Sequence, residues 1–128
     1  DPQLLNPAFA DMLRSVRATF CMGLHAKMPP IEDQLPMLRA MWPGPLVCRW
    51  NLHRRHGRFG YEDAEKLYGP FDKIVDPDPE TRAALAKVIA GTTRAGQNAF
   101  VTVSNNAEGC APLTIAQLAR DVLALAPR

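Results

Sequence analysis

Hydrophobic residues along the chain follow two patterns. Some short runs are almost wholly apolar and rich in strand-forming residues, and they cover residues 18–24, 46–50 and 99–103. Longer stretches repeat hydrophobic residues at helical spacing, over residues 7–16, 32–41, 61–68, 78–92 and 114–125. Apolar runs of this length are typical of buried strands, and the helical spacing is typical of amphipathic helices. Strands that alternate with helices predict an α/β fold.

The residues between these segments support the same division. Asn6 followed by Pro7 is typical of a helix start, because Asn caps free backbone N–H groups and Pro suits the first helical position. Thr114 is placed to cap the last predicted helix. The twelve prolines gather in the connections, which indicates several short elements instead of a few long ones.

The predicted strands carry few polar side chains. Strands that are apolar at nearly every position suit a parallel sheet covered by helices on both faces. A parallel sheet of about three strands cannot close into a barrel and leaves two edges with unpaired backbone groups. We therefore expect either a piece of a larger barrel or self-association through the open strand edges.

Several segments carry a resemblance to a known family. They are the opening stretch 1–9, the strand end Arg49-Trp50-Asn51 with its following Tyr61, the stretch Ser104-Asn105-Asn106, and Gly109-Cys110-Ala111 leading to Ala116 and Leu118. In these segments the chain resembles the C-terminal part of the YecE-like proteins, the family called domain of unknown function 72. The resemblance covers essentially the whole chain, and the paired asparagines followed by Gly-x-Ala are its most specific part.

The resemblance implies an architecture but no activity. It implies a partial TIM-type (β/α) barrel, with about three parallel strands and flanking helices. Residues 1–128 would form a single domain equivalent to the C-terminal half of a larger barrel. The family usually has Arg-x-His-Gly at a strand end, where this chain has Arg49-Trp50-Asn51-Leu52, so the chain would belong to a divergent branch. The function of the family is itself unknown.

Composition narrows the class of protein. A hydrophobic fraction of 47% and a charged fraction of 22% are typical of folded proteins, and a net charge of +2 is too small for nucleic-acid binding by bulk charge. No apolar run approaches the roughly 18 residues of a membrane span, so we expect no membrane partner. The three cysteines are far apart and form no CxxC pair, which indicates a reducing, cytoplasmic location without disulfides or a zinc ribbon.

Polar residues at the predicted strand ends form the first candidate site. The carboxyl ends of parallel strands are where α/β folds hold ligands. Arg49 lies inside an apolar run, so we expect a buried guanidinium that either binds an anion or forms a structural ion pair. His25 is the best candidate for proton transfer. The predicted ligand-binding side chains are Arg49, Asn51, Asn105, Asn106, Arg54 and Arg55.

These residues predict binding of a small anionic or phosphorylated ligand, and they leave open whether a reaction follows. Asn105 and Asn106 have an alternative role, in which they stabilise the turn by bonding nearby backbone. Glu108 is a candidate acid or base only if its loop turns it inward. The sequence has no HExxH motif, phosphate loop or dinucleotide fingerprint, so we expect no metal and no cofactor.

A different class of function is suggested by the basic stretch 53–58. Its arginines and histidines predict a non-enzymatic nucleic-acid or protein binding module, in which positive charge contacts phosphates. A solvated surface loop is the simpler interpretation. Phe59 and Tyr61 are the only aromatic residues nearby, so a stacking platform for single strands is weakly supported.

Overall fold

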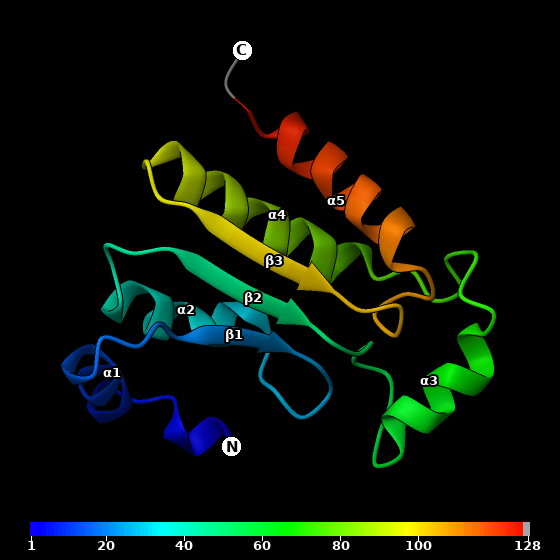
Figure 1. Cartoon of the computed structure of the whole chain (residues 1–128), viewed down its shortest axis with the longest axis horizontal. Helices are drawn as coiled ribbons and strands as arrows, with labels where there is room; N and C mark the ends of the chain where they lie inside the picture. Colours follow the sequence, from blue (N-terminus) through cyan, green and yellow to red (C-terminus); the bar gives the residue numbers. More distant parts are fainter. Residues whose placement is uncertain (127–128) are drawn as a thin grey trace.

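The computed structural model describes residues 1–126 and shows a mixed α/β fold (Figure 1). Within these residues none of the helices has both the length and the apolar composition of a membrane-spanning segment. The elements in chain order are η1 (Pro2–Leu4), α1 (Pro7–Ser15), β1 (Cys21–Leu24), α2 (Ile31–Ala40), β2 (Leu46–Trp50), α3 (Gly60–Tyr68), α4 (Pro79–Arg94), β3 (Ala99–Val103) and α5 (Ala111–Ala124).

The strands form one parallel sheet in the order β1-β2-β3. Neighbouring positions in the register form rows across the sheet, and one row contains Gly23, Arg49 and Thr102. The predicted parallel α/β class is confirmed by this sheet. The relationship to a TIM-type barrel stays a prediction.

Helices cover one face of the sheet. Met22, Cys48 and Trp50 are almost completely buried on that face, where they pack in a core with residues of α1, α2, α4 and α5. In Figure 1, α2 and α4 lie behind the strands and α5 lies beside α4. The opposite face, here called the open face, presents Cys21, Gly23, Val47, Arg49, Phe100 and Thr102, none of which is buried.

The expectation that helices cover both faces is therefore wrong for residues 1–126. Side chains of a strand alternate between the two faces, so each strand here has one buried and one open set. The open set still includes apolar residues such as Val47 and Phe100, and Phe100 is 58% exposed. An apolar run therefore does not reveal which face of the sheet is covered.

Two helices begin at the residues that the sequence indicates. The Asn6 side-chain oxygen accepts a hydrogen bond from the Phe9 N–H at 3.0 Å, and Asp78 does the same for Thr81 at 3.2 Å. The last helix differs, because α5 begins after Cys110 and not at Thr114. Thr114 is completely buried within α5 and does not cap it.

Candidate functional site at the carboxyl ends of the strands

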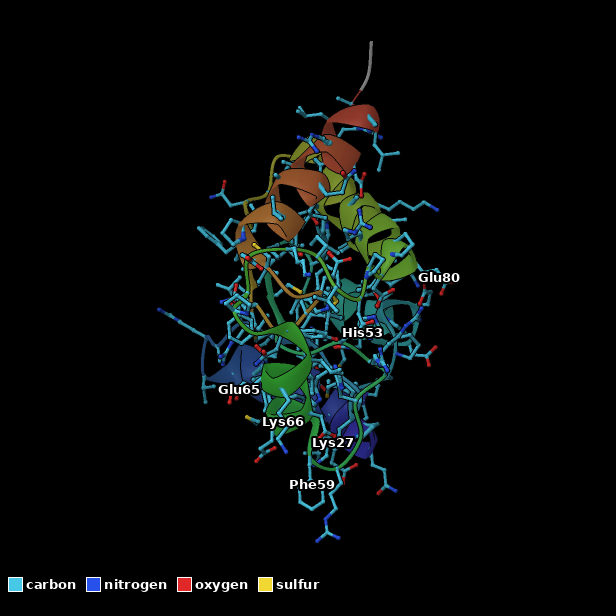
Figure 2. All side chains as sticks on the ribbon, turned by 90° about the vertical axis from the view of Figure 1, so that its right-hand side faces the viewer. Lys27, His53, Phe59, Glu65, Lys66 and Glu80 are labelled. Carbon is cyan, nitrogen blue, oxygen red and sulfur yellow. The ribbon has the colours of Figure 1, made fainter. Side chains whose placement is uncertain are left out.

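The carboxyl ends of the three strands are tied together by backbone hydrogen bonds. Asn51 N donates to Leu24 O at 3.1 Å, and Ser104 N donates to Trp50 O at 2.9 Å. The loop after β2 joins the loop after β3, where His53 N donates to Asn106 O at 2.9 Å. The segments that carry the predicted site residues therefore meet at one end of the sheet. Figure 2 shows this end, with α3 in front of it.

Arg49 lies on the open face and is exposed, so the expectation of a buried guanidinium is wrong. The alternation of β2 places it opposite the buried side chains of Cys48 and Trp50. Within residues 1–126 its guanidinium makes neither a hydrogen bond nor an ion pair. Its register neighbour is Gly23, where an added Cβ would lie 4.0 Å from His25 Cδ2 and 3.7 Å from Met28 Cγ. His25 and Arg49 therefore both adjoin Gly23 on the open side of the sheet.

His25 also borders a small cavity between the loops that follow β1 and β2. The cavity has a volume of about 100 Å³, and we call it the His25 cavity. Two of its lining residues, Lys27 and Arg58, are cations, and no lining residue is acidic. Figure 2 shows Lys27 and Phe59 on the same side of this end of the molecule. The lining residues are His25, Ala26, Lys27, Leu52, Gly57, Arg58, Gly60 and Tyr61.

The ring of His25 is held in one tautomer. Its Nδ1 atom accepts a hydrogen bond from Lys27 N at 3.2 Å, so the neutral ring carries its proton on Nε2. Partial burial lowers the pKa of His25, and the positive charges of Lys27 and the N-terminus lower it further. At neutral pH the ring is therefore uncharged and can donate one hydrogen bond through Nε2.

The two predicted arginines of the basic loop are already paired within the chain. Arg54 Nη2 lies 2.6 Å from Glu80 Oε2 and 3.3 Å from Asp78 Oδ1. Arg55 Nη1 donates to both carboxylate oxygens of Asp76 at 2.8 Å. These pairs reduce the positive charge that residues 53–58 offer to a phosphate.

The two paired asparagines have different roles. The Asn105 side-chain oxygen accepts from Ala111 N at 2.8 Å, which supports the interpretation that Asn105 stabilises the turn before α5. The Asn106 backbone holds the loop after β2, whereas its side-chain oxygen is buried and has no partner within residues 1–126. Asn51 is half-buried at the end of β2.

Glu108 does turn inward, but its carboxylate is fully used by the fold. The residue is 1% exposed. One oxygen accepts from Asp78 N at 2.6 Å and from Arg82 Nε at 3.1 Å, and the other accepts from the Thr114 hydroxyl at 2.8 Å. Its backbone oxygen accepts from Val75 N and from Asp76 N, at 2.8 and 3.0 Å. Glu108 therefore joins the loop before α4 to the loop after β3.

No pattern in the sequence predicts the hydrogen-bonded chain that links α3 to both neighbouring loops. His56 Nε2 lies 2.7 Å from Tyr68 Oη, and Tyr68 donates to Asp76 Oδ2 at 2.7 Å. Tyr68 is 1% exposed and His56 is 5% exposed. Burial alone would raise the pKa of Asp76, but the hydrogen bonds from Tyr68 and Arg55 outweigh it and lower the pKa. Burial raises the pKa of Tyr68 strongly, and the Asp76 carboxylate adds to the effect.

Residues 1–126 contain no group of three or more His, Cys, Asp or Glu side chains arranged to hold a metal ion. Comparison of the chain with protein-family models, with curated proteins and with solved structures gives no match. Geometry and chemistry at the strand ends are therefore the basis for the functional conclusion.

Proposed function

We propose that this protein binds a small anionic ligand, such as a phosphate-bearing compound or a carboxylate, at the carboxyl ends of its strands. The observation that carries the proposal is the His25 cavity, whose lining includes Lys27 and Arg58 and no carboxylate. Cations gathered without acidic neighbours attract an anion, and the effect is stronger where water is partly excluded. The volume of about 100 Å³ suits a single phosphate or carboxylate group.

Each group at this end of the sheet has a distinct part in the proposal. Lys27 and Arg58 would supply charge. The Arg58 guanidinium lies 5.3 Å over the exposed Phe59 ring and would turn toward the anion to bond two of its oxygens. His25 donates one hydrogen bond to the anion through Nε2; its lone pair on Nδ1 already accepts from Lys27 N, so we propose it as a binding group and not as a proton acceptor. Arg49 and Asn51 would contact the part of a longer ligand that extends over the open face.

Titration with inorganic phosphate tests this proposal, with the ring resonances of His25 followed by NMR. We expect the resonances to shift on binding, and Lys27→Ala and Arg58→Ala each to weaken binding by about tenfold, which is the loss of one charge-assisted hydrogen bond. Lys73→Ala is the matched control, because Lys73 is exposed and lies outside the cavity lining. Equal effects of all three variants, or no shift of His25, would refute the proposal.

The rival function, a nucleic-acid or protein binding module built on residues 53–58, has weaker support. Arg54 and Arg55 already face carboxylates of the same chain. If nucleic acid does bind through this loop, replacing both arginines will flatten the dependence of affinity on salt.

The relationship to the YecE-like barrel is proposed on two features of the sheet. The strands follow one another in sequence order, and the helices packed on the sheet cover a single face. Helices lie only on the outside of a (β/α) barrel, whereas doubly wound folds carry helices on both faces. The open face would then correspond to the interior of a barrel.

A further inference from the structure

A second cavity adjoins α3, and we call it the α3 cavity. It has a volume of about 390 Å³ and shares only Gly57 with the lining of the His25 cavity. Lys66 carries the one cation of its lining that forms no ion pair within residues 1–126, and Figure 2 shows Lys66 at the front of α3. The lining residues are Arg55, His56, Gly57, Asp63, Lys66 and Leu67.

The hydrogen-bonded chain behind this cavity determines where the proton of His56 lies. Tyr68 has one hydroxyl proton and donates it to Asp76, whose carboxylate can only accept. The Tyr68 oxygen must therefore accept from His56 Nε2, 2.7 Å away. In the neutral ring Nε2 then carries the proton, and Nδ1 carries a free lone pair.

Nδ1 of His56 is not completely buried. Within residues 1–126 the atom makes no hydrogen bond, and it keeps some exposure to solvent. Because His56 lines the α3 cavity, a ligand in the cavity can reach this atom.

The ring is also rigidly oriented. Asp76 is clamped by two hydrogen bonds from Arg55, both 2.8 Å long, and it fixes the Tyr68 hydroxyl in turn. The His56 ring packs edge-on against Tyr68, with 5.5 Å between the ring centroids. An imidazole whose second nitrogen is held by a further group is the usual arrangement of a histidine that accepts protons.

The charges around His56 favour its neutral form. Burial is the largest cause of the lowered pKa of His56, and the positive charges of Arg55 and His53 lower it further. Asp76 and Asp63 act in the opposite direction but do not outweigh these effects. The lone pair on Nδ1 is therefore available at neutral pH.

We propose that the α3 cavity binds a small hydroxylated anion, whose hydroxyl donates to His56 Nδ1 while its anionic group pairs with Lys66. Tyr68 and Asp76 are positioning residues, because they act on the ligand only through His56. The proposal stands on a different cavity and different residues from the phosphate site proposed above, so either can fail without the other.

Glycolate and acetate form a matched pair of probes, because the two anions have the same charge and differ by one hydroxyl. We expect the ¹⁵N spectrum of the free protein to show His56 protonated on Nε2. We further expect glycolate to shift the Nδ1 resonance and to bind about tenfold more tightly than acetate, the difference that one hydrogen bond makes. Phosphate binding at the His25 cavity would instead shift His25, and Lys27→Ala should leave the glycolate response unchanged.

Variants distinguish a ligand-binding site from a hydrogen-bonded chain that only stabilises the fold. Lys66 lies on the surface of α3, so its replacement should not disturb the core. Lys66→Ala should weaken glycolate binding by about tenfold, whereas Lys66→Arg should retain the binding. Tyr68→Phe should release the tautomer of His56, which the same ¹⁵N spectrum reports in the folded variant. The proposal is overturned if the free protein carries the proton on Nδ1, if glycolate and acetate act alike, or if Lys66→Ala binds glycolate like the wild type.

Discussion

Glu108→Ala is the substitution with the largest expected effect on stability. The side chain is 1% exposed and accepts hydrogen bonds from Asp78 N, Arg82 Nε and the Thr114 hydroxyl. Alanine would leave these donors without their partner and Arg82 without its buried counter-charge. The Arg82 side chain is only 13% exposed, so water cannot readily replace the carboxylate.

The expected cost follows from the lost contacts. Breaking a buried ion pair by removing one partner costs about 3–5 kcal/mol. Each lost hydrogen bond to a charged group costs about 1.5–3 kcal/mol, but bonds to one carboxylate do not add fully. Asp121 lies 3.9 Å from Arg82 Nη1 and compensates in part. We therefore expect Glu108→Ala to lower the free energy of unfolding by about 4 kcal/mol.

Glu108→Gln separates charge from hydrogen bonding. The amide oxygen can still accept from Asp78 N and Arg82 Nε, and the amide N–H can donate to the Thr114 oxygen. Only the charge is lost, so the expected cost is about 1–2 kcal/mol.

Urea denaturation followed by circular dichroism measures all of these variants. Glu65→Ala is the control, because Glu65 is exposed on α3 and its side chain forms no ion pair within residues 1–126; it should change the free energy of unfolding by less than about 0.5 kcal/mol. The reasoning is refuted if Glu108→Ala costs less than about 1 kcal/mol, or if Glu108→Gln costs as much as Glu108→Ala.

Three further predictions concern backbone, pH and association. Gly109→Ala should lower the free energy of unfolding, measured by heat or urea, by at least about 2 kcal/mol, because φ is +125° and the new Cβ would lie 2.6 Å from Lys73 O. Gly91→Ala, where the new Cβ meets open space within α4, should instead raise the free energy of unfolding by about 0.5–1 kcal/mol. Burial would raise the pKa of Asp76, but its hydrogen bonds lower that pKa, so the carboxylate stabilises the fold above the ordinary carboxyl pKa and this contribution is lost as pH falls through the lower folded value. Below about pH 4 the free energy of unfolding should therefore depend less steeply on pH in Asp76→Asn than in the wild type, and equal slopes would contradict this. The open strand edges and exposed Phe100 predict concentration-dependent self-association, which Phe100→Lys should weaken in sedimentation velocity; a wild-type monomer at every concentration would exclude it.

Local signals predicted most of the elements of the fold. The apolar runs at β2 and β3 give the observed strands because polar or turn-forming residues flank them closely. β1 is shorter than its run, since Ala18, Thr19 and Phe20 lie outside the sheet. The covered face was not predicted, because the open positions include apolar residues such as Val47 and Phe100. The polar strand residues Arg49 and Thr102 both lie on the open face, and this weak signal was not used. Which face is buried depends on how the helices return to the sheet.

The candidate site was harder to predict than the fold. The sequence predicted that the loops with His25, Asn51 and Asn106 would meet at one end of the sheet, and they do; that a ligand binds there stays a prediction. It did not indicate that Arg54 and Arg55 are paired, because their partners lie more than 20 residues away along the chain. The chain from His56 to Asp76 was missed because its hydrogen bonds join residues 12 and 8 apart, and no helical or strand repeat brings such positions together. Contacts between distant loops depend on tertiary packing, which residue spacing does not record.

The charge on the open face limits which molecules can cover it. Of its six residues only Arg49, on the central strand, carries a charge. A wholly apolar surface packed on the sheet would remove water from that guanidinium without supplying a hydrogen-bond acceptor in its place. The open face therefore selects a covering molecule by polarity as well as by shape, and it favours one that places an acidic group over the central strand.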